Sequence, residues 1–197
     1  MLTTSSNQRF QNQRVVSMLR HLIAALILVL ALSTGTAEHT EAEIGITDPG
    51  IAEAGGPAPD FLLIDLEQNP VRLSDFRGQP LLLNFFASWC SPCLKELPLI
   101  QDAYLRAADQ GFIVLGVGYQ DSRWAIEELA EDAGLTFPIV IDGDNSVGQA
   151  YRVIGPPYTF FIDADGIVID VVSGAMDVEI LQRNLDNLLK PGKTDAV

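Results

Sequence analysis

The stretch CSPC at residues 90–93 contains Cys90 and Cys93, the two cysteines of this 197-residue chain. Thiolate sulfur attacks disulfides, binds soft metal ions and forms disulfide bonds. Two cysteines at this spacing are therefore compatible with a redox-active dithiol, with half of a metal site, or with a structural disulfide. Which of these three applies decides what the protein does.

The sequence disfavours a zinc or iron–sulfur site. Such sites take about four protein ligands. The two histidines, His21 and His39, both precede the predicted domain, which contains no cysteine beyond the pair. A two-thiolate copper site is a minor alternative, because soft thiolates suit copper(I). A structural disulfide closing so short a loop would restrict the unfolded chain little and stabilise the fold little.

The elements around the pair favour redox chemistry. LLLNFF at 81–86 is a continuous apolar run, typical of a buried strand in a mainly parallel sheet. A helix is predicted from about 92 to 110, and its expected buried stripe is Leu94, Leu97, Gln101, Tyr104 and Ala108. The cysteines thus lie where a buried strand ends and a helix begins. Main-chain N–H groups and the helix dipole at that terminus stabilise a thiolate.

Geometry then suggests a role for each cysteine. Cys90, at the exposed lip of the helix, is expected to be the nucleophile that attacks a partner disulfide. Cys93, one turn further on, is expected to be the more buried resolving thiol. Trp89 precedes the pair and is either a flat apolar contact for the partner or an ordinary packing residue, and the sequence leaves both open.

The remaining pattern predicts an α/β domain with a mixed sheet. Strands alternate with helices and the chain finishes in a hairpin and a helix. The expected strands are two apolar runs within 61–73, joined as a hairpin around the turn residues 67–70, then 81–86, 112–119, 138–142, and a final hairpin over 158–174. The expected helices are 92–110, 121–134, 145–151 and 177–189.

The N-terminal residues predict targeting and tethering. Residues 1–37 combine three arginines with an apolar stretch from Leu22 to Leu32, as in a signal peptide or a membrane anchor. Either alternative would export the domain, with the basic side remaining inside. Residues 38–56 are acidic and rich in Gly, Ala and Pro, so a flexible linker is expected there. The folded domain is expected over 57–193.

The charge balance excludes some functions. The chain has 12 Lys and Arg residues against 26 Asp and Glu residues. So acidic a domain repels the phosphates of nucleic acids. It also has little attraction to an anionic membrane surface, which leaves the N-terminal segment as the expected membrane contact.

The segment NFFASWCSPCLKELP at 84–98 resembles the active site of the thioredoxin superfamily, and specifically of its TlpA/ResA-like thiol–disulfide oxidoreductases (redoxin, AhpC/TSA-like). APDFLLIDLEQNPVRLSDFRGQPLLLNFFASWC and AYRVIGPPYTFFIDADGIVIDVVSGAMD resemble the opening hairpin and the cis-proline loop of that branch. The resemblance covers most of 57–193. It implies a thioredoxin fold with an added N-terminal β-hairpin and an inserted helix and strand near 122–141.

The resemblance also implies roles for further residues. Pro157 matches the cis-proline that shapes the peptide-docking surface, and an X-Pro bond is the one that adopts cis at low cost. Pro156 before it has no N–H, so substrate docking is expected to use its carbonyl together with Trp89 and Pro157. Glu96 matches the acidic residue of the branch, where burial would raise its pKa and let it move protons. Asn84 stands where cytoplasmic thioredoxins have a buried acid.

The implied activity is extracytoplasmic reduction of disulfides in partner proteins. The family implies cysteines of apocytochrome c or of an oxidase copper site as targets, and a membrane thiol reductase as electron donor. We expect no cofactor beyond the Cys90–Cys93 disulfide, and we expect the protein to be a monomer. The alternatives are a disulfide-donating oxidase and a thiol peroxidase, although Ala87 occupies the place of the Thr or Ser that a peroxiredoxin needs. A non-catalytic binding module is a further alternative.

Overall fold

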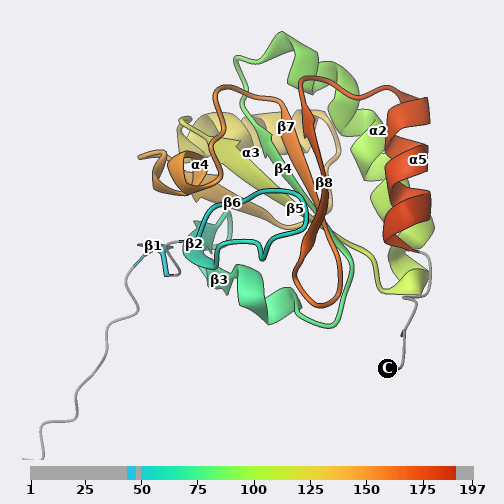
Figure 1. Cartoon of the computed structure of the whole chain (residues 1–197). Helices are drawn as coiled ribbons and strands as arrows, with labels where there is room; N and C mark the ends of the chain where they lie inside the picture. The colour runs from blue at the N-terminus through green and yellow to red at the C-terminus, as the bar shows by residue number, and fades with distance from the viewer. Residues whose placement is uncertain (1–43, 48–49, 190–197) are drawn as a thin grey trace, which may run out of the picture. The chain divides into compact units, whose positions relative to one another are not determined.

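The computed structural model describes residues 44–47 and 50–189, which form a mixed sheet of eight strands with helices on both faces (Figure 1). The strands are β1 (Gly45–Ile46), β2 (Phe61–Asp65), β3 (Pro70–Arg72), β4 (Leu81–Phe86), β5 (Ile113–Tyr119), β6 (Ile139–Asp142), β7 (Tyr158–Ile162) and β8 (Val168–Ser173). The helices are α2 (Ser91–Ala107), α3 (Arg123–Asp132), α4 (Ser146–Ala150) and α5 (Val178–Leu188), with short 3-10 turns η1 (Leu73–Phe76) and η2 (Ala108–Gln110).

Strand β4 lies inside the sheet, between β5 and β7, and leads directly to the two cysteines. The strand order is β1-β2-β6-β5-β4-β7-β8, and β3 pairs with β2. Strand β4 runs parallel to β5 and antiparallel to β7, and β5 runs parallel to β6. All six residues of β4 are buried. This matches the continuous apolar run in the sequence, because a strand covered on both faces needs apolar residues on both.

Alternation along β4 divides the core into two parts. Leu82 and Phe86 pack with buried residues of α2, α3 and α5, whereas Leu83 and Phe85 pack with buried residues of α4 and β2. Such alternation follows from the two-residue period of a strand. Gly118 of β5 permits close packing on the first face, since a Cβ there would lie 3.0 Å from a side-chain carbon of Ile126 in α3.

Most of the expected elements are confirmed. The hairpin β2–β3, the alternating strands and helices, and the final hairpin β7–β8 followed by α5 lie where the pattern predicts them. The inserted helix and strand near 122–141 are α3 and β6. The Ser122 hydroxyl caps α3 by accepting from the Ala125 N–H at 3.2 Å. The predicted stripe of α2 is wrong at Leu94, which is 42% exposed.

Part of the range expected to be a flexible linker packs against the domain instead. Strand β1 pairs antiparallel with β2, and Ala52 is buried. The Gly55 N–H donates to the Val168 carbonyl at 2.8 Å. Main-chain hydrogen bonds hold this segment, and such bonds do not produce a periodic pattern of apolar residues in the sequence. The ordered chain therefore begins before Pro57, the start that the sequence predicts.

The predicted signal peptide or anchor at 1–37 and the C-terminal residues 190–193 lie outside the described residues. Among the helices that are described, none is long and apolar enough to cross a membrane.

Tyr151 provides a test of the part of the core that contains Leu83 and Phe85. Its hydroxyl donates to the Pro59 carbonyl at 2.7 Å, and its ring packs edge-on against Phe160 at 5.0 Å between centroids. Tyr151→Phe keeps the ring and leaves the Pro59 carbonyl without its donor. We expect the free energy of unfolding to fall by about 1–3 kcal/mol. Denaturant titration measures it, with Tyr158→Phe as the control, because no hydrogen bond of the Tyr158 hydroxyl is found among the described residues. Equal losses in both variants would contradict this account.

Candidate active site

Cys90 and Cys93 form a disulfide at the start of α2, directly after β4. The two sulfur atoms are 2.05 Å apart and the two Cα atoms 5.3 Å apart. Cys93 is fully buried, and Cys90 is 4% exposed, so only an edge of it reaches solvent. Cys90 is thus the more accessible of the two, but less exposed than the lip position predicted from the sequence.

Cys90 occupies the N-cap position of α2. Its carbonyl accepts the first helical hydrogen bond, from the Leu94 N–H at 3.2 Å. Its sulfur accepts from the Cys93 N–H at 3.3 Å. A Ser or Asp oxygen usually makes this second bond. A negative charge on the Cys90 sulfur is therefore favoured by a main-chain donor and by the positive end of the helix dipole.

This arrangement suits thiol–disulfide exchange. In the reduced protein, a thiolate at Cys90 can attack a partner disulfide, form a mixed disulfide and release one partner thiolate. The Cys93 thiolate can then attack the Cys90 sulfur, which releases the second partner thiol and forms the disulfide seen here. Two electrons pass from the protein to the partner in this direction.

Glu96 is fully buried three residues beyond Cys93, on the same helix. Its Oε1 accepts from Asn84 Nδ2 at 3.0 Å, and its Oε2 accepts from the Met176 N–H at 2.9 Å. Asn84 Nδ2 also donates to Thr159 Oγ1 at 2.9 Å. This buried polar cluster of Asn84, Glu96, Thr159 and the Met176 N–H joins β4, α2, β7 and the loop before α5.

Burial raises the pKa of Glu96 above its ordinary value, and the hydrogen bonds from Met176 and Asn84 offset part of the rise. Both donors are neutral. The structure thus places an acid–base group of raised pKa within one helical turn of Cys93. Among the described residues, buried Asn84 Oδ1 has no hydrogen-bond partner.

A second loop accompanies the cysteines at this edge of the sheet. Phe85 pairs with Tyr158 across β4 and β7, so the chain after β4 and the chain before β7 leave the sheet together. Trp89 in the first loop is 59% exposed. In the second loop Pro156 is half-buried, Pro157 is buried, and the bond between them is cis, the isomer that the resemblance implies.

Sequence reasoning missed two residues at this edge. Ile154, three residues before Pro157, is 90% exposed, which is unusual for so large an apolar side chain. Asp121, at the start of the helix expected over 121–134, accepts from the N–H and the hydroxyl of Ser88, at 2.8 and 2.7 Å. The position of Ile154 in a Gly- and Pro-containing loop was a signal for its exposure, whereas no local pattern indicated the contact between Asp121 and Ser88.

Within residues 44–47 and 50–189, no group of three or more His, Cys, Asp or Glu side chains is arranged to hold a metal ion.

Comparisons with known proteins agree with this geometry. The model of the AhpC/TSA family matches residues 54–171. The chain is 38% identical to the thiol–disulfide oxidoreductase ResA of Geobacillus kaustophilus over 164 residues, covering 83% of this chain and 92% of that protein. It is 37% identical to ResA of Bacillus subtilis over 142 residues, covering 72% of this chain and 79% of that protein.

The fold is similar to that of a solved structure, a putative thiol:disulfide interchange protein DsbE from Chlorobium tepidum. The TM-score is 0.66 at 28% sequence identity, over 70% of this chain and 99% of that one. The capped cysteine pair, the thioredoxin-like sheet and these relatives agree with one another. The chain therefore belongs to the AhpC/TSA family and is a thiol–disulfide oxidoreductase of the ResA type.

Proposed function

We propose that the protein is an extracytoplasmic reductase of disulfides in selected partner proteins. The observation that carries the proposal is the Cys90–Cys93 pair at the capped start of α2, together with the buried Glu96, in a chain similar to ResA. The substrates proposed are the haem-site cysteines of an apocytochrome c or the copper-site cysteines of an oxidase. These targets present paired cysteines, which suits a dithiol that delivers two electrons in each cycle.

The proposal includes a membrane thiol reductase as electron donor. Each cycle leaves Cys90 and Cys93 as a disulfide, which needs two electrons and two protons before the next cycle. The N-terminal sequence pattern supports an extracytoplasmic location, held at the membrane by residues 1–37 or exported after their removal. We propose that the protein is a monomer and that it uses no cofactor beyond the disulfide.

A thiol peroxidase is disfavoured by one position. Ala87, three residues before Cys90, is buried and has no hydroxyl to bind a peroxide. A disulfide-donating oxidase would use the same residues in the opposite direction, so the reduction potential distinguishes it from a reductase.

The reduction potential of the Cys90–Cys93 couple tests the direction of electron flow. We expect the full-length chain, equilibrated in thiol–disulfide buffers, to have a potential near or below that of thioredoxin, about −270 mV. The measurement follows the fraction of free thiol against the buffer potential. A value near about −120 mV, typical of a strong periplasmic oxidant, would overturn the assigned direction.

Glu96 is proposed to accept the proton of Cys93 during the second step of exchange. Glu96→Gln removes this acceptor while keeping the shape, and rotation of the Asn84 amide group would let its unpartnered oxygen accept from the new side chain. We expect resolution of the mixed disulfide to slow by about a hundredfold at neutral pH. The carboxyl inflection should also disappear from the pH profile of that rate. An unchanged profile would remove Glu96 from the mechanism.

Glu96→Gln also changes how the free energy of unfolding depends on pH, in the direction set by the raised pKa of Glu96. Between the ordinary value of 4.5 and the raised value, the folded state binds more protons at this site than the unfolded state. The free energy of unfolding of the wild type therefore falls as the pH rises through that window. Glu96→Gln should lose the Glu96 part of this decline and keep the part from Asp142, whose pKa burial also raises, whereas Glu128→Gln, at an exposed position, should retain all of it.

Trp89 is proposed to contact the partner protein. Trp89→Ala should raise KM for a protein disulfide severalfold and leave the rate with a small disulfide close to that of the wild type. Leu105→Ala is the matched control, because Leu105 is 60% exposed against 59% for Trp89 and lies near the other end of α2. If both variants behave alike, or if both substrates are affected equally in Trp89→Ala, Trp89 does not bind the partner.

A further inference from the structure

The turn of the N-terminal hairpin is held rigidly by Asp65, the last residue of β2. Its Oδ1 accepts from the N–H groups of Glu67 and Asn69 at 2.9 and 2.8 Å. Its Oδ2 accepts from Asn69 Nδ2 at 3.2 Å. Asp side chains commonly order turns through such bonds to the following main chain. The turn therefore offers a fixed main-chain surface to whatever packs on it.

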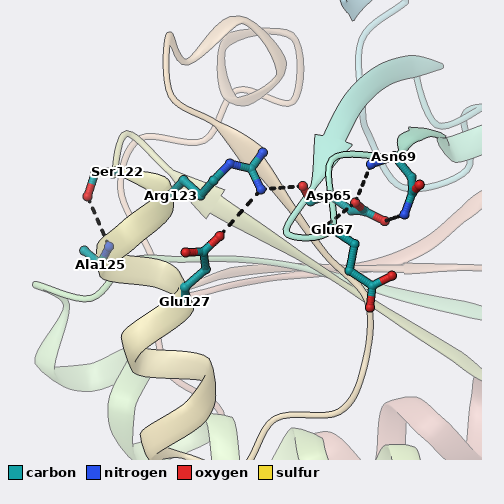
Figure 2. A network of polar contacts seen from close by, with 7 residues as sticks. All are labelled: Asp65, Glu67, Asn69, Ser122, Arg123, Ala125 and Glu127. Atoms are coloured by element: carbon teal, nitrogen blue, oxygen red, sulfur yellow. Dashed lines mark hydrogen bonds and ion pairs between the residues drawn. The ribbon is translucent and has the colours of Figure 1, made fainter.

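Arg123 binds this turn from the first position of α3 (Figure 2). Its Nη1 donates to the Asp65 carbonyl at 2.5 Å. With the Gln68 amide oriented so that its oxygen faces the guanidinium group, that oxygen accepts from Nη1 and Nε at 3.2 and 3.0 Å. Glu127, one turn along α3, lies 3.8 Å from Nη1. The Arg123 side chain is 28% exposed, so these bonds are partly shielded from water.

The residues just before Arg123 bind the active-site loop. Asp121 Oδ2 accepts from the Ser88 N–H and hydroxyl, and its Oδ1 accepts from the Ser122 N–H at 2.7 Å. Ser88 is two residues before Cys90, and the Cys90 N–H donates to the Ala87 carbonyl at 3.1 Å. Asp121 is thus the link between the start of α3 and the loop that delivers Cys90 to its cap position.

We propose that Arg123 is a positioning residue for thiol–disulfide exchange: by fixing the start of α3 on the β2–β3 turn, it holds Asp121 against Ser88 and so keeps Cys90 aligned with the Cys93 N–H. The guanidinium group makes several directional bonds from one planar group, which suits it to fix orientation. The added hairpin thereby acts on the cysteines without touching them. The inference concerns the exchange reaction itself and holds for any partner disulfide.

Arg123→Ala tests the proposal in the full-length reduced chain. The rate constant for reaction with 4,4′-dithiodipyridine, a neutral disulfide, is measured against pH, at a temperature where circular dichroism shows the variant folded. We expect the rate at neutral pH to fall about threefold to tenfold. The midpoint of the profile should move to higher pH, because a misaligned N–H stabilises the Cys90 thiolate less. An unchanged rate and midpoint would overturn the proposal.

Two controls separate positioning from a simple loss of charge. Arg106→Ala removes the same charge from a side chain that is 68% exposed, in an ion pair of 3.9 Å with Asp102, and should leave the profile unchanged. The effect of Arg123→Ala should also persist at high salt, where interactions between separated exposed charges are screened. A matching shift in Arg106→Ala, or loss of the effect in salt, would assign it to charge and contradict the proposal.

A double variant tests the route through Asp121. In an Asp121→Ala background the link to Ser88 is already lost, so Arg123→Ala should cause no further slowing. If the two substitutions slow the reaction by independent, multiplying factors, Arg123 does not act through Asp121 and the proposal fails.

Discussion

The complete burial of β4 is the constraint on which the rest of the structure depends. This buried strand leads directly into a helix that packs on one of its two covered faces. Here the chain turns onto the face covered by α2, and the turn comes between Phe86 and Ser91. Cys90 is thereby placed at the junction, where its sulfur accepts a hydrogen bond from the Cys93 N–H of the new helix. The chemistry of the pair follows from where the core forces the strand to end.

The burial of β4 also brings the carboxyl group of Glu96 into the part of the core that packs against α2, α3 and α5. Asn84 is the polar exception among the buried residues of β4, and it faces the side on which α2 packs. Glu96 contacts Asn84 there, and its carboxyl group accepts hydrogen bonds from two neutral donors. A buried ionised carboxylate without a cationic partner is costly. Burial accordingly raises the pKa of Glu96, and a carboxyl group of raised pKa near reactive cysteines is typical of a functional site.

Local patterns predicted the elements of this fold better than their contacts. The apolar run at β4, the turn residues 67–70 of the hairpin β2–β3 and the start of α3 at Asp121 or Ser122 each carry their signal within a few residues. The resemblance to the thioredoxin superfamily, rather than any periodicity, indicated the burial of Glu96. Leu94 was misplaced because the buried stripe of α2 runs through Cys93, Leu97 and Ile100, and Leu94 lies to one side of it.

Other features were beyond sequence reasoning because they depend on contacts between distant segments. The N–H of Gly55 bonds to β8 through the main chain, which any residue type can do. The local sequence indicated a helix that starts near Asp121 and gave no sign of what Arg123 and Asp121 bind. Their partners, Asp65 and Ser88, are 58 and 33 residues away in the chain. Only the packing of α3 between the hairpin and the active-site loop shows what these side chains do.

The N-cap role of the Cys90 sulfur has a consequence for turnover. A mixed disulfide replaces a sulfur that can carry charge by a neutral one, which is a weaker acceptor for the Cys93 N–H. The helix terminus is best satisfied when Cys90 departs as a thiolate. Cys90 is therefore expected to leave readily as a thiolate, since the helix terminus stabilises the charge that it carries away. Departure of Cys90 completes the step in which a dithiol reductant, held on Cys90 as a mixed disulfide, is closed by its own second thiolate; when a partner disulfide is reduced, Cys93 attacks and the partner thiolate leaves instead.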